Sequence, residues 1–230
     1  MKYFVMSDLH GSAYYTRKLL DIYKGGEYEK LLLLGDLLYH GPRNDLPKDY
    51  APKEVIAMLN PLKDEILAVR GNCDAEVDQM VLDFPVMATY ALLVLNGVTF
   101  YATHGHIYNP ENLPPINPGE ALIYGHVHLP IAEKRGDIYI LNPGSTSIPK
   151  GGNPPSYAVL EDKHFQILTF DGQVIKEGNP AEILADRRIL EEANLKETSL
   201  HYMAEKAGIN SEELIRTFVN FEKHHQKASD

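Results

Sequence analysis

Short apolar runs alternate with helix-like periodicities through the first 70 residues of the chain. Apolar residues recur at helical spacing over 12–24 and 52–62, with Gly25 and Gly26 ending the first helix and Pro52 starting the second. Three continuous apolar runs flank these segments, at 3–6, 31–34 and 66–69. Such runs are typical of strands buried on both faces, so the pattern predicts alternating βα units.

From residue 92 onward the pattern changes to short strands joined by tight turns. The dipeptides Asn96-Gly97, Gly136-Asp137 and Asp171-Gly172 favour hairpin connections. The expected strands are 92–95, 98–103, 121–124, 131–134, 138–141, 156–160, 164–170 and 173–177. Alternating βα units followed by a β-rich half predict a mixed α/β fold of two sheets with helices outside.

Residues 179–230 carry no strand signal and form a second predicted unit. Helix-like patches cover about 181–193, 197–207 and 211–225. We therefore expect one domain over 1–178 and a C-terminal helical extension over 179–230. Apolar residues recur at helical spacing in these patches, so the extension is either a solvated appendage or a surface for a homo-oligomer or protein partner.

The 230-residue chain has a formal net charge of −10 and one cysteine, Cys73. The negative balance gives no general attraction to nucleic acid or anionic membranes, so we expect no nucleic-acid partner. No apolar run approaches the length of a membrane span or a signal-peptide core, which predicts no membrane insertion. A single cysteine excludes an internal disulfide and favours a reducing compartment, so a cytoplasmic location is expected.

Metal-competent side chains follow five of the predicted strands. The segments are Asp8-Leu9-His10, Gly35-Asp36, Gly71-Asn72-Cys73-Asp74, His104-Gly105-His106 and Gly125-His126-Val127-His128. In an open α/β sheet, ligands bind at the carboxyl ends of the strands, so we expect these five ends to converge. Singly each has a plain alternative, since Asp8 suits a helix cap and Asp36 or Asn72 suits a turn. Five such coincidences favour one shared site.

Seven candidate ligands are too many for one tetrahedral site and fit a binuclear centre with a shared carboxylate. They are Asp8, His10, Asp36, Asn72, His104, His126 and His128. Carboxylate, amide and imidazole donors suit Mn²⁺, Fe, Zn²⁺ or Ni²⁺ better than an all-oxygen Ca²⁺ cage. Two such ions activate a water and stabilise in-line displacement at phosphorus, so we expect a small phosphate ester as the substrate.

These five motifs, in this order over roughly residues 1–178, resemble the signature motifs of the calcineurin-like metallophosphoesterases. Further likeness to the YfcE-type bacterial phosphodiesterase branch lies in 40–44, 142–145 and 148–153. The resemblance implies a four-layer αββα sandwich of two mixed sheets flanked by helices, with two metal ions, Mn²⁺ first among them. It implies that the first ion is held by Asp8, His10 and His128, the second by Asn72, His104 and His126, and that Asp36 bridges them.

The resemblance also implies a reaction. A hydroxide held by the metal ions attacks a phosphodiester directly, with Asp36, Asn72 and His104 at the catalytic centre. Phosphomonoesters or nucleotides are alternative substrates of the same centre. An interpretation from another class keeps the metal site as a low-activity scaffold whose tail recruits a partner.

Four further residues carry open assignments. Cys73 stands where many members of the family have a histidine that can act as general acid, and it is either a small filler or a weak acid near the substrate. His106 is either a support for a metal ligand or an outer-sphere donor. Arg43 and His40 are candidate substrate contacts, because a guanidinium can grip a phosphate oxygen; the alternatives are a solvated arginine and a loop cap.

Residues 165–200 carry a second, weaker resemblance, to the end of cobalt or energy-coupling-factor ABC transporter ATPase subunits. It lies in 170–174, 176–184 and 190–195. The chain has no Gly-rich Walker loop to cradle a nucleotide phosphate, which excludes ATPase activity. The resemblance therefore points at most to transporter-related partners of the tail.

Overall fold

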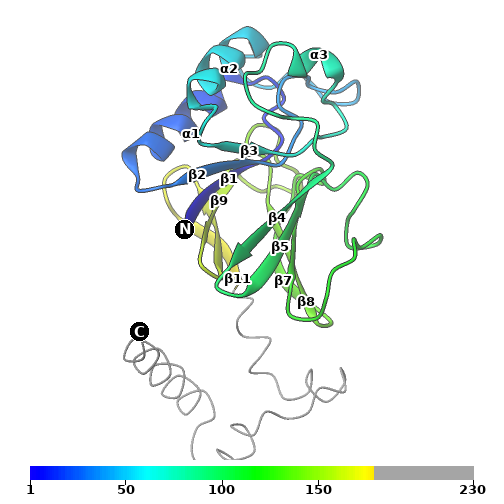
Figure 1. Cartoon of the computed structure of the whole chain (residues 1–230). Coiled ribbons are helices and arrows are strands. Elements are labelled where there is room, and N and C mark those ends of the chain that lie inside the picture. The colour runs from blue at the N-terminus through cyan, green and yellow to red at the C-terminus, as the bar shows by residue number, and fades with distance from the viewer. Residues whose placement is uncertain (179–230) are drawn as a thin grey trace, which may run out of the picture. The chain divides into compact units, whose positions relative to one another are not determined.

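Two mixed β-sheets face each other in the computed structural model, which describes residues 1–178 (Figure 1). The first has the order β11-β10-β9-β1-β2-β3, with bounds Val174–Gly178, His164–Thr169, Ser156–Glu161, Lys2–Met6, Lys30–Leu33 and Ile66–Ala68. The second has the order β4-β5-β6-β8-β7, with bounds Tyr90–Leu95, Val98–Thr103, Ala121–Ile123, Ile138–Pro143 and Pro130–Arg135. All the strands predicted from the sequence are confirmed. The predicted extension over 179–230, with its helices and partner surface, lies outside the described residues.

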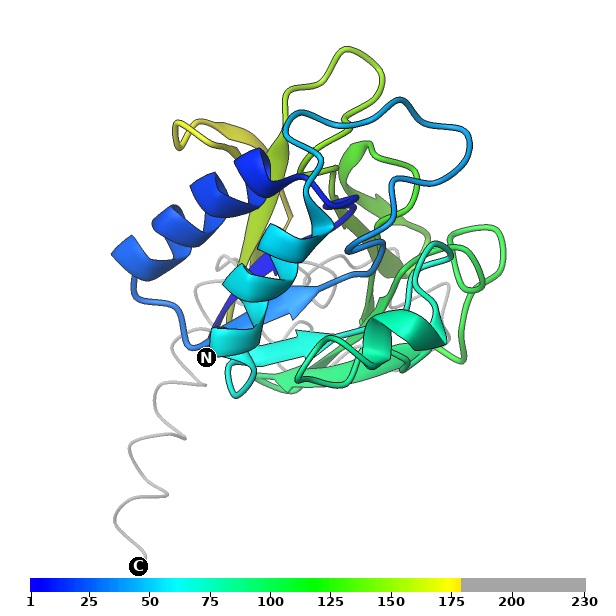
Figure 2. The ribbon, with the colours of Figure 1, turned by 90° about the horizontal axis from the view of Figure 1, so that it is seen from above.

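Two helices cover the outer face of the first sheet beside β1 and β2 (Figure 2). They are α1, Ala13–Gly25, and α2, Pro52–Leu59, which continues into the short 3-10 helix η1, Asn60–Leu62. The Ser12 side chain caps α1 by accepting a hydrogen bond from the Tyr15 amide at 3.3 Å, and Pro52 opens α2 as the sequence predicts. No helix among the described residues is long and apolar enough to cross a membrane.

Strand alternation divides the buried side chains of the first sheet between two layers. Phe4 faces the helices, where its ring contacts Tyr23, Tyr28 and Tyr157 at centroid distances of 5.7, 4.9 and 4.6 Å. Val5, the next residue of β1, faces the other sheet and is fully buried. One strand thus contributes to both apolar layers, which explains the uninterrupted apolar runs of its sequence.

The outer face of the second sheet carries a separate apolar cluster formed by Tyr101, Leu122 and Ile140. Tyr108 and Ile116, from the connection between β5 and β6, pack against it. Two mixed sheets with flanking helices are therefore confirmed, but on this face the described residues supply a loop where the four-layer expectation has a helix. The short helix α3, Glu76–Gln79, was not predicted, because four residues are too few to show a helical period.

The topology decides where the polar strand ends meet. Strands β1, β2 and β3 are parallel neighbours in the first sheet, and β5 and β6 are parallel neighbours in the second. Their carboxyl ends therefore lie at the same edge of the sandwich. Backbone hydrogen bonds join the segments that leave these ends, from the Asp8 amide to the Gly35 carbonyl at 3.2 Å and from the Gly125 amide to the His104 carbonyl at 2.8 Å.

Candidate metal centre

Five of the predicted ligands leave their strands through a left-handed backbone conformation. The φ angles are 56° at Asp8, 48° at His10, 54° at Asp36, 66° at His126 and 61° at His128. This region is disfavoured for residues with a Cβ, by about 1–3 kcal/mol each, and such strain concentrates at functional sites. At each of these residues the backbone turns sharply, so that the side chain points toward the edge that the two sheets share. If the strand continued, the side chain would lie farther from that edge.

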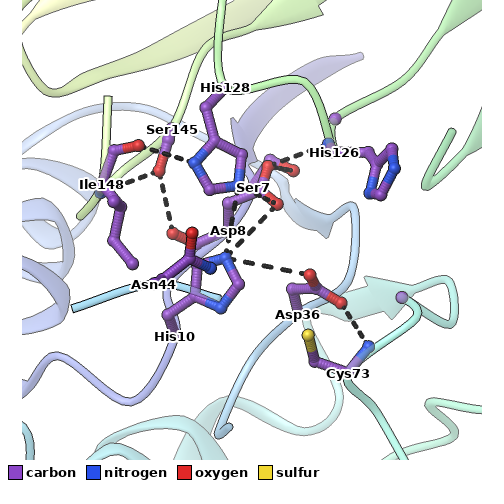
Figure 3. Close-up of polar contacts among 12 residues, drawn as sticks. Ser7, Asp8, His10, Asp36, Asn44, Cys73, His126, His128, Ser145 and Ile148 are labelled. Atoms are coloured by element: carbon purple, nitrogen blue, oxygen red, sulfur yellow. Dashed lines mark hydrogen bonds and ion pairs between the residues drawn. The ribbon is translucent and has the colours of Figure 1, made fainter. Parts of the chain in front are cut away.

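Asp8, His10 and His128 form one buried cluster of donor atoms (Figure 3). The His128 Nε2 lies 3.2 Å from Asp8 Oδ1 and 3.3 Å from His10 Nε2. The other carboxylate oxygen of Asp8, Oδ2, accepts hydrogen bonds from Ser7 Oγ at 2.7 Å and from the His126 amide at 3.1 Å. Asp8 Oδ1 is buried and accepts no hydrogen bond from the described residues, so it is an unsatisfied anionic ligand atom.

Asp36, His104 and His126 form a second cluster beside the first. The His104 Nε2 lies 3.5 Å from Asp36 Oδ2 and 3.1 Å from Asn72 Oδ1. The same Asp36 oxygen lies 3.8 Å from the His10 Nε2 of the first cluster, as the dashed line in Figure 3 marks. The structure therefore brings all seven predicted ligands together, with Asp36 between two groups of donors.

Three of the imidazole rings are locked so that Nε2 faces the clusters. The Nδ1 atoms of His10, His104 and His128 lie 2.9, 2.6 and 2.6 Å from the backbone carbonyl oxygens of Tyr39, Leu34 and Ile148. A carbonyl only accepts, so each Nδ1 carries the proton and Nε2 of the neutral ring carries a lone pair. These lone pairs point at carboxylate oxygens and at one another. A cation relieves that repulsion, so the donor set fits bound metal ions.

When no metal ion is bound, a proton supplies part of the positive charge that the cluster needs. Burial lowers the pKa of His104, but its hydrogen bond to Asp36 and the charges of Asp8 and Asp36 outweigh burial and raise the pKa to about 9. Burial alone would raise the pKa of Asp36, yet the hydrogen bond to His104 and the nearby imidazoles hold that pKa well below its usual range. In the metal-free protein at neutral pH, His104 is therefore protonated against ionised Asp36.

Asp74 holds two of the ligand segments in register. Its carboxylate accepts backbone hydrogen bonds from Asp36 at 2.8 Å, from Leu37 at 2.8 Å and from Gly71 at 2.7 Å. It thereby fixes the end of β2, which carries Asp36, to the end of β3, which carries Asn72. Asp74 lies in a sequence motif but has no predicted role, because two of its three partners follow another strand.

The segment after β8 supports the ligand loops from behind. Ser145 and Ser147 donate their hydroxyl hydrogens to the Asp8 carbonyl at 3.1 and 2.9 Å. Asn142 donates from its side chain to the Gly125 carbonyl at 2.8 Å. Sequence reasoning missed these three residues as supports of the site. The turn-forming run Asn142-Pro143-Gly144-Ser145 was their only local signal.

Cys73 and His106 lie beside the clusters. The Cys73 amide donates to Asp36 Oδ1 at 2.8 Å, and burial together with the Asp36 charge holds the pKa of the thiol well above its usual range. The ring of His106 lies 5.4 Å from that of His104, and its buried Nδ1 has no hydrogen-bond partner among the described residues. Burial and the neighbouring His104 lower the pKa of His106. The roles of both residues remain predictions.

A cavity of about 480 Å³ opens over the clusters. Arg43 lines it, and its contact with a substrate stays a prediction. Asn44 and Lys150, which have no role predicted from the sequence, also line it. His40 is not among the lining residues, and its ring packs 5.3 Å from that of Tyr50. The volume lies in the range of small-molecule sites, about 300–1,000 Å³.

The chain was compared with known proteins. A family model described as the calcineurin-like phosphoesterase superfamily domain matches residues 1–164. Phosphodiesterase YfcE of Escherichia coli (strain K12) is 47% identical over 175 residues, which are 76% of this chain and 95% of that protein. Phosphodiesterase MJ0936 of Methanocaldococcus jannaschii is 26% identical over 152 residues, 63% of this chain and 83% of that protein.

Solved structures agree with these matches. A phosphoesterase Yfce from E. coli aligns with a TM-score of 0.75 at 47% identity, covering 77% of this chain and 98% of that one. Vps29 from Entamoeba histolytica, complexed with Zn²⁺, aligns with a TM-score of 0.53 at 23% identity over 78% of this chain and 99% of its own, and shares the fold.

Two facing mixed sheets with buried carboxylates and imidazoles at one edge define a phosphoesterase of the metal-dependent class. The chain belongs to the calcineurin-like phosphoesterase superfamily and is a phosphoric ester hydrolase.

The close approach of Gly71 to Asp36 gives a first prediction. A Cβ at Gly71 would lie 2.1 Å from Asp36 Oδ1 and 2.3 Å from the Asp36 amide nitrogen. Gly71→Ala is therefore expected to displace Asp36 and lower kcat/KM by about 100-fold, as a displacement near 1 Å does in other sites. In Gly25→Ala the new Cβ meets nothing within 4 Å, so this control should keep its activity and thermal stability. Equal activity of the two variants would contradict the assignment of Asp36 to the catalytic centre.

The protonated His104 gives a second prediction. Binding of a cation at Nε2 requires that proton to leave, so adding Mn²⁺ to chelator-stripped protein at pH 7 should release about one proton per chain. Release should fall as the pH rises through about 9, where His104 is already neutral, and metal affinity should rise over the same range. Calorimetric titrations in buffers of different ionisation enthalpy measure the release. Metal binding at pH 7 without proton release would show that His104 is not a ligand.

Proposed function

We propose that this chain hydrolyses a small phosphodiester at a centre of two divalent cations. Asp8, His10 and His128 are the proposed ligands of one cation, and Asn72, His104 and His126 of the other. The observation that carries the proposal is the position of Asp36 Oδ2, 3.8 Å from the His10 Nε2 and 3.5 Å from the His104 Nε2. A single carboxylate oxygen between two sets of imidazoles suits a bridging ligand.

The donor set supports Mn²⁺ as the first choice of cation, with Fe, Zn²⁺ and Ni²⁺ as alternatives. The proposed ligands combine hard carboxylate and amide oxygens with imidazole nitrogens. Cys73 also lies within reach of His10 and Asp36 but is not among the proposed ligands. When bound, two divalent cations lower the pKa of a water and neutralise charge on a phosphate, which hydrolysis by direct attack of water requires. The chain itself holds the imidazoles in one tautomer, keeps both carboxylates ionised and supplies Arg43 at the cavity for a phosphate oxygen.

One observation supports a diester over a monoester, and another supports a good leaving group. Two relatives carry the name phosphodiesterase. In addition, the thiol of Cys73 has a pKa well above its usual range, because it is partly buried beside the Asp36 charge. A thiol so reluctant to lose its proton is a poor general acid, so the reaction relies on a leaving group that departs without protonation.

Chelator-stripped protein assayed with and without Mn²⁺ tests the proposal. Bis(p-nitrophenyl) phosphate should be hydrolysed only with metal, and faster than p-nitrophenyl phosphate. Faster turnover of the monoester would favour a phosphomonoesterase or nucleotide phosphatase on the same centre. If neither ester is hydrolysed in a metal-dependent way, the enzyme proposal is wrong and the interpretation as a low-activity metal-bound scaffold remains.

The ligand assignment is tested by Asp36→Asn and His126→Ala. Each should lower kcat/KM for the diester by at least about 100-fold, since even indirect supports of a metal ligand are worth about 10–100-fold. Matched controls are Asp21→Asn on the exposed side of α1 and His164→Ala on β10, both distant in the fold from the strand ends that carry the ligands. Metal content and thermal unfolding of each variant separate lost ligands from lost folding. Undiminished turnover in either site variant refutes that ligand.

A further inference from the structure

Two cationic side chains line the cavity away from the metal ligands. They are Arg43, on the loop after β2, and Lys150, on the loop after β8. Both side chains belong to exposed residues, as does the ligand Asn72, whereas the other ligands that line the cavity are buried or half-buried. Among the described lining residues the only acidic one is Asp36, which is a proposed metal ligand. No other carboxylate of the cavity lining therefore neutralises the two cations.

The Lys150 loop is hydrogen-bonded to a segment that carries a metal ligand, and the Arg43 loop is held by a hydrogen bond within itself and packs beside Cys73. The Lys150 amide donates to the His128 carbonyl at 3.1 Å, and the Lys150 carbonyl accepts from the Asn153 side chain at 2.8 Å. On the other loop, Asn44 donates to the His40 carbonyl at 2.8 Å, and Gly41 has a φ of 81°. A Cβ at Gly41 would lie 3.2 Å from the Cys73 sulfur, so this loop packs directly on the site.

Neither cation has an ion-pair or hydrogen-bond partner for its side chain within residues 1–178. Two exposed arginines elsewhere in this acidic chain do have such partners. Arg17 pairs with Glu54 at 2.7 Å, and Arg135 pairs with Glu133 at 3.0 Å. In a chain of net charge −10, cations left unpaired at the rim of the cavity create a local field that attracts an anion.

The reacting phosphate does not need both of them. Two divalent cations bring four positive charges, and Asp8 and Asp36 cancel two. A hydroxide nucleophile would cancel one more, and the one positive charge that remains balances the single negative charge of a phosphodiester. Arg43 and Lys150 together therefore suit a second anionic group, and a cavity of about 480 Å³ has room for a substrate of nucleotide size.

We propose that the substrate is a phosphodiester with a second phosphate, which Arg43 and Lys150 bind. This second phosphate lies on the ester group that stays attached to the reacting phosphate after hydrolysis. The inference rests on the proposed diesterase function. A guanidinium and an ammonium offer the charge-assisted hydrogen bonds that a phosphate dianion accepts. A diester without that group still reaches the metal centre but loses these contacts.

Two matched substrates test this selectivity: thymidine 5′-(p-nitrophenyl phosphate) and its 3′-phosphorylated form. The reacting phosphate and leaving group are identical, so only the second phosphate differs. With Mn²⁺, the 3′-phosphate should raise kcat/KM about tenfold or more, mainly through KM, as charged hydrogen bonds do. The ratio between the two substrates should fall toward one in Lys150→Gln and in Arg43→Gln. It should persist in Lys150→Arg and in Lys63→Gln, an exposed lysine that does not line the cavity.

A binding measurement without metal provides the second readout. Thymidine 3′,5′-bisphosphate is titrated into protein kept in chelator, and its Kd should rise about fivefold or more in Lys150→Gln, relative to Lys63→Gln. The inference is overturned if the wild-type protein has nearly equal kcat/KM for the two thymidine esters and Lys150→Gln leaves the Kd of the bisphosphate unchanged. That result would leave the diesterase proposal intact. Hydrolysis of bis(p-nitrophenyl) phosphate under the same conditions tests the diesterase proposal separately. If neither thymidine ester is hydrolysed, the Kd comparison alone decides whether the cations bind a phosphate.

Discussion

The site depends on three imidazoles whose Nδ1 atoms are held by backbone carbonyls while their Nε2 atoms face buried carboxylates. Neutral rings in this arrangement present lone pairs to Asp8 and Asp36, so the cluster repels itself unless positive charge lies within it. Metal ions are the charge that the donor set fits. In their absence the raised pKa of His104, about 9, shows how strongly the cluster attracts a cation of any kind.

Such a cluster persists because the fold fixes it from several directions. Asp74 ties the end of β2 to the end of β3 through three backbone hydrogen bonds. Ser145 and Ser147 hold the Asp8 carbonyl from the opposite side. These contacts over-determine the loops, which is the condition under which left-handed backbone at the ligand positions is tolerated. These contacts thus hold the ligand-bearing loops in place.

The strands and the location of the site were predictable, because their signals are local in the sequence. Apolar runs located the strands, and the polar residues after them located the site, since parallel strands place their carboxyl ends together. The roles of Asp74, Ser145 and Ser147 were not predictable, because each binds a backbone group 38 or more residues away. The loop layer over Tyr101 and Leu122 also escaped prediction, because apolar residues in the 104–120 connection have neither strand nor helix periodicity. Lys150 lay within the 148–153 segment of family likeness, but nothing in the sequence placed its side chain at the cavity.

The central claim is that two cations share Asp36 at the junction of the two donor clusters. Anomalous diffraction at the manganese edge, from crystals of chelator-stripped protein resupplied with Mn²⁺, tests it most directly. The account predicts two anomalous peaks about 3.5–4 Å apart, one among Asp8, His10 and His128, the other among Asn72, His104 and His126, both in bonding contact with Asp36. A single peak, or two peaks of which only one contacts Asp36, would contradict it.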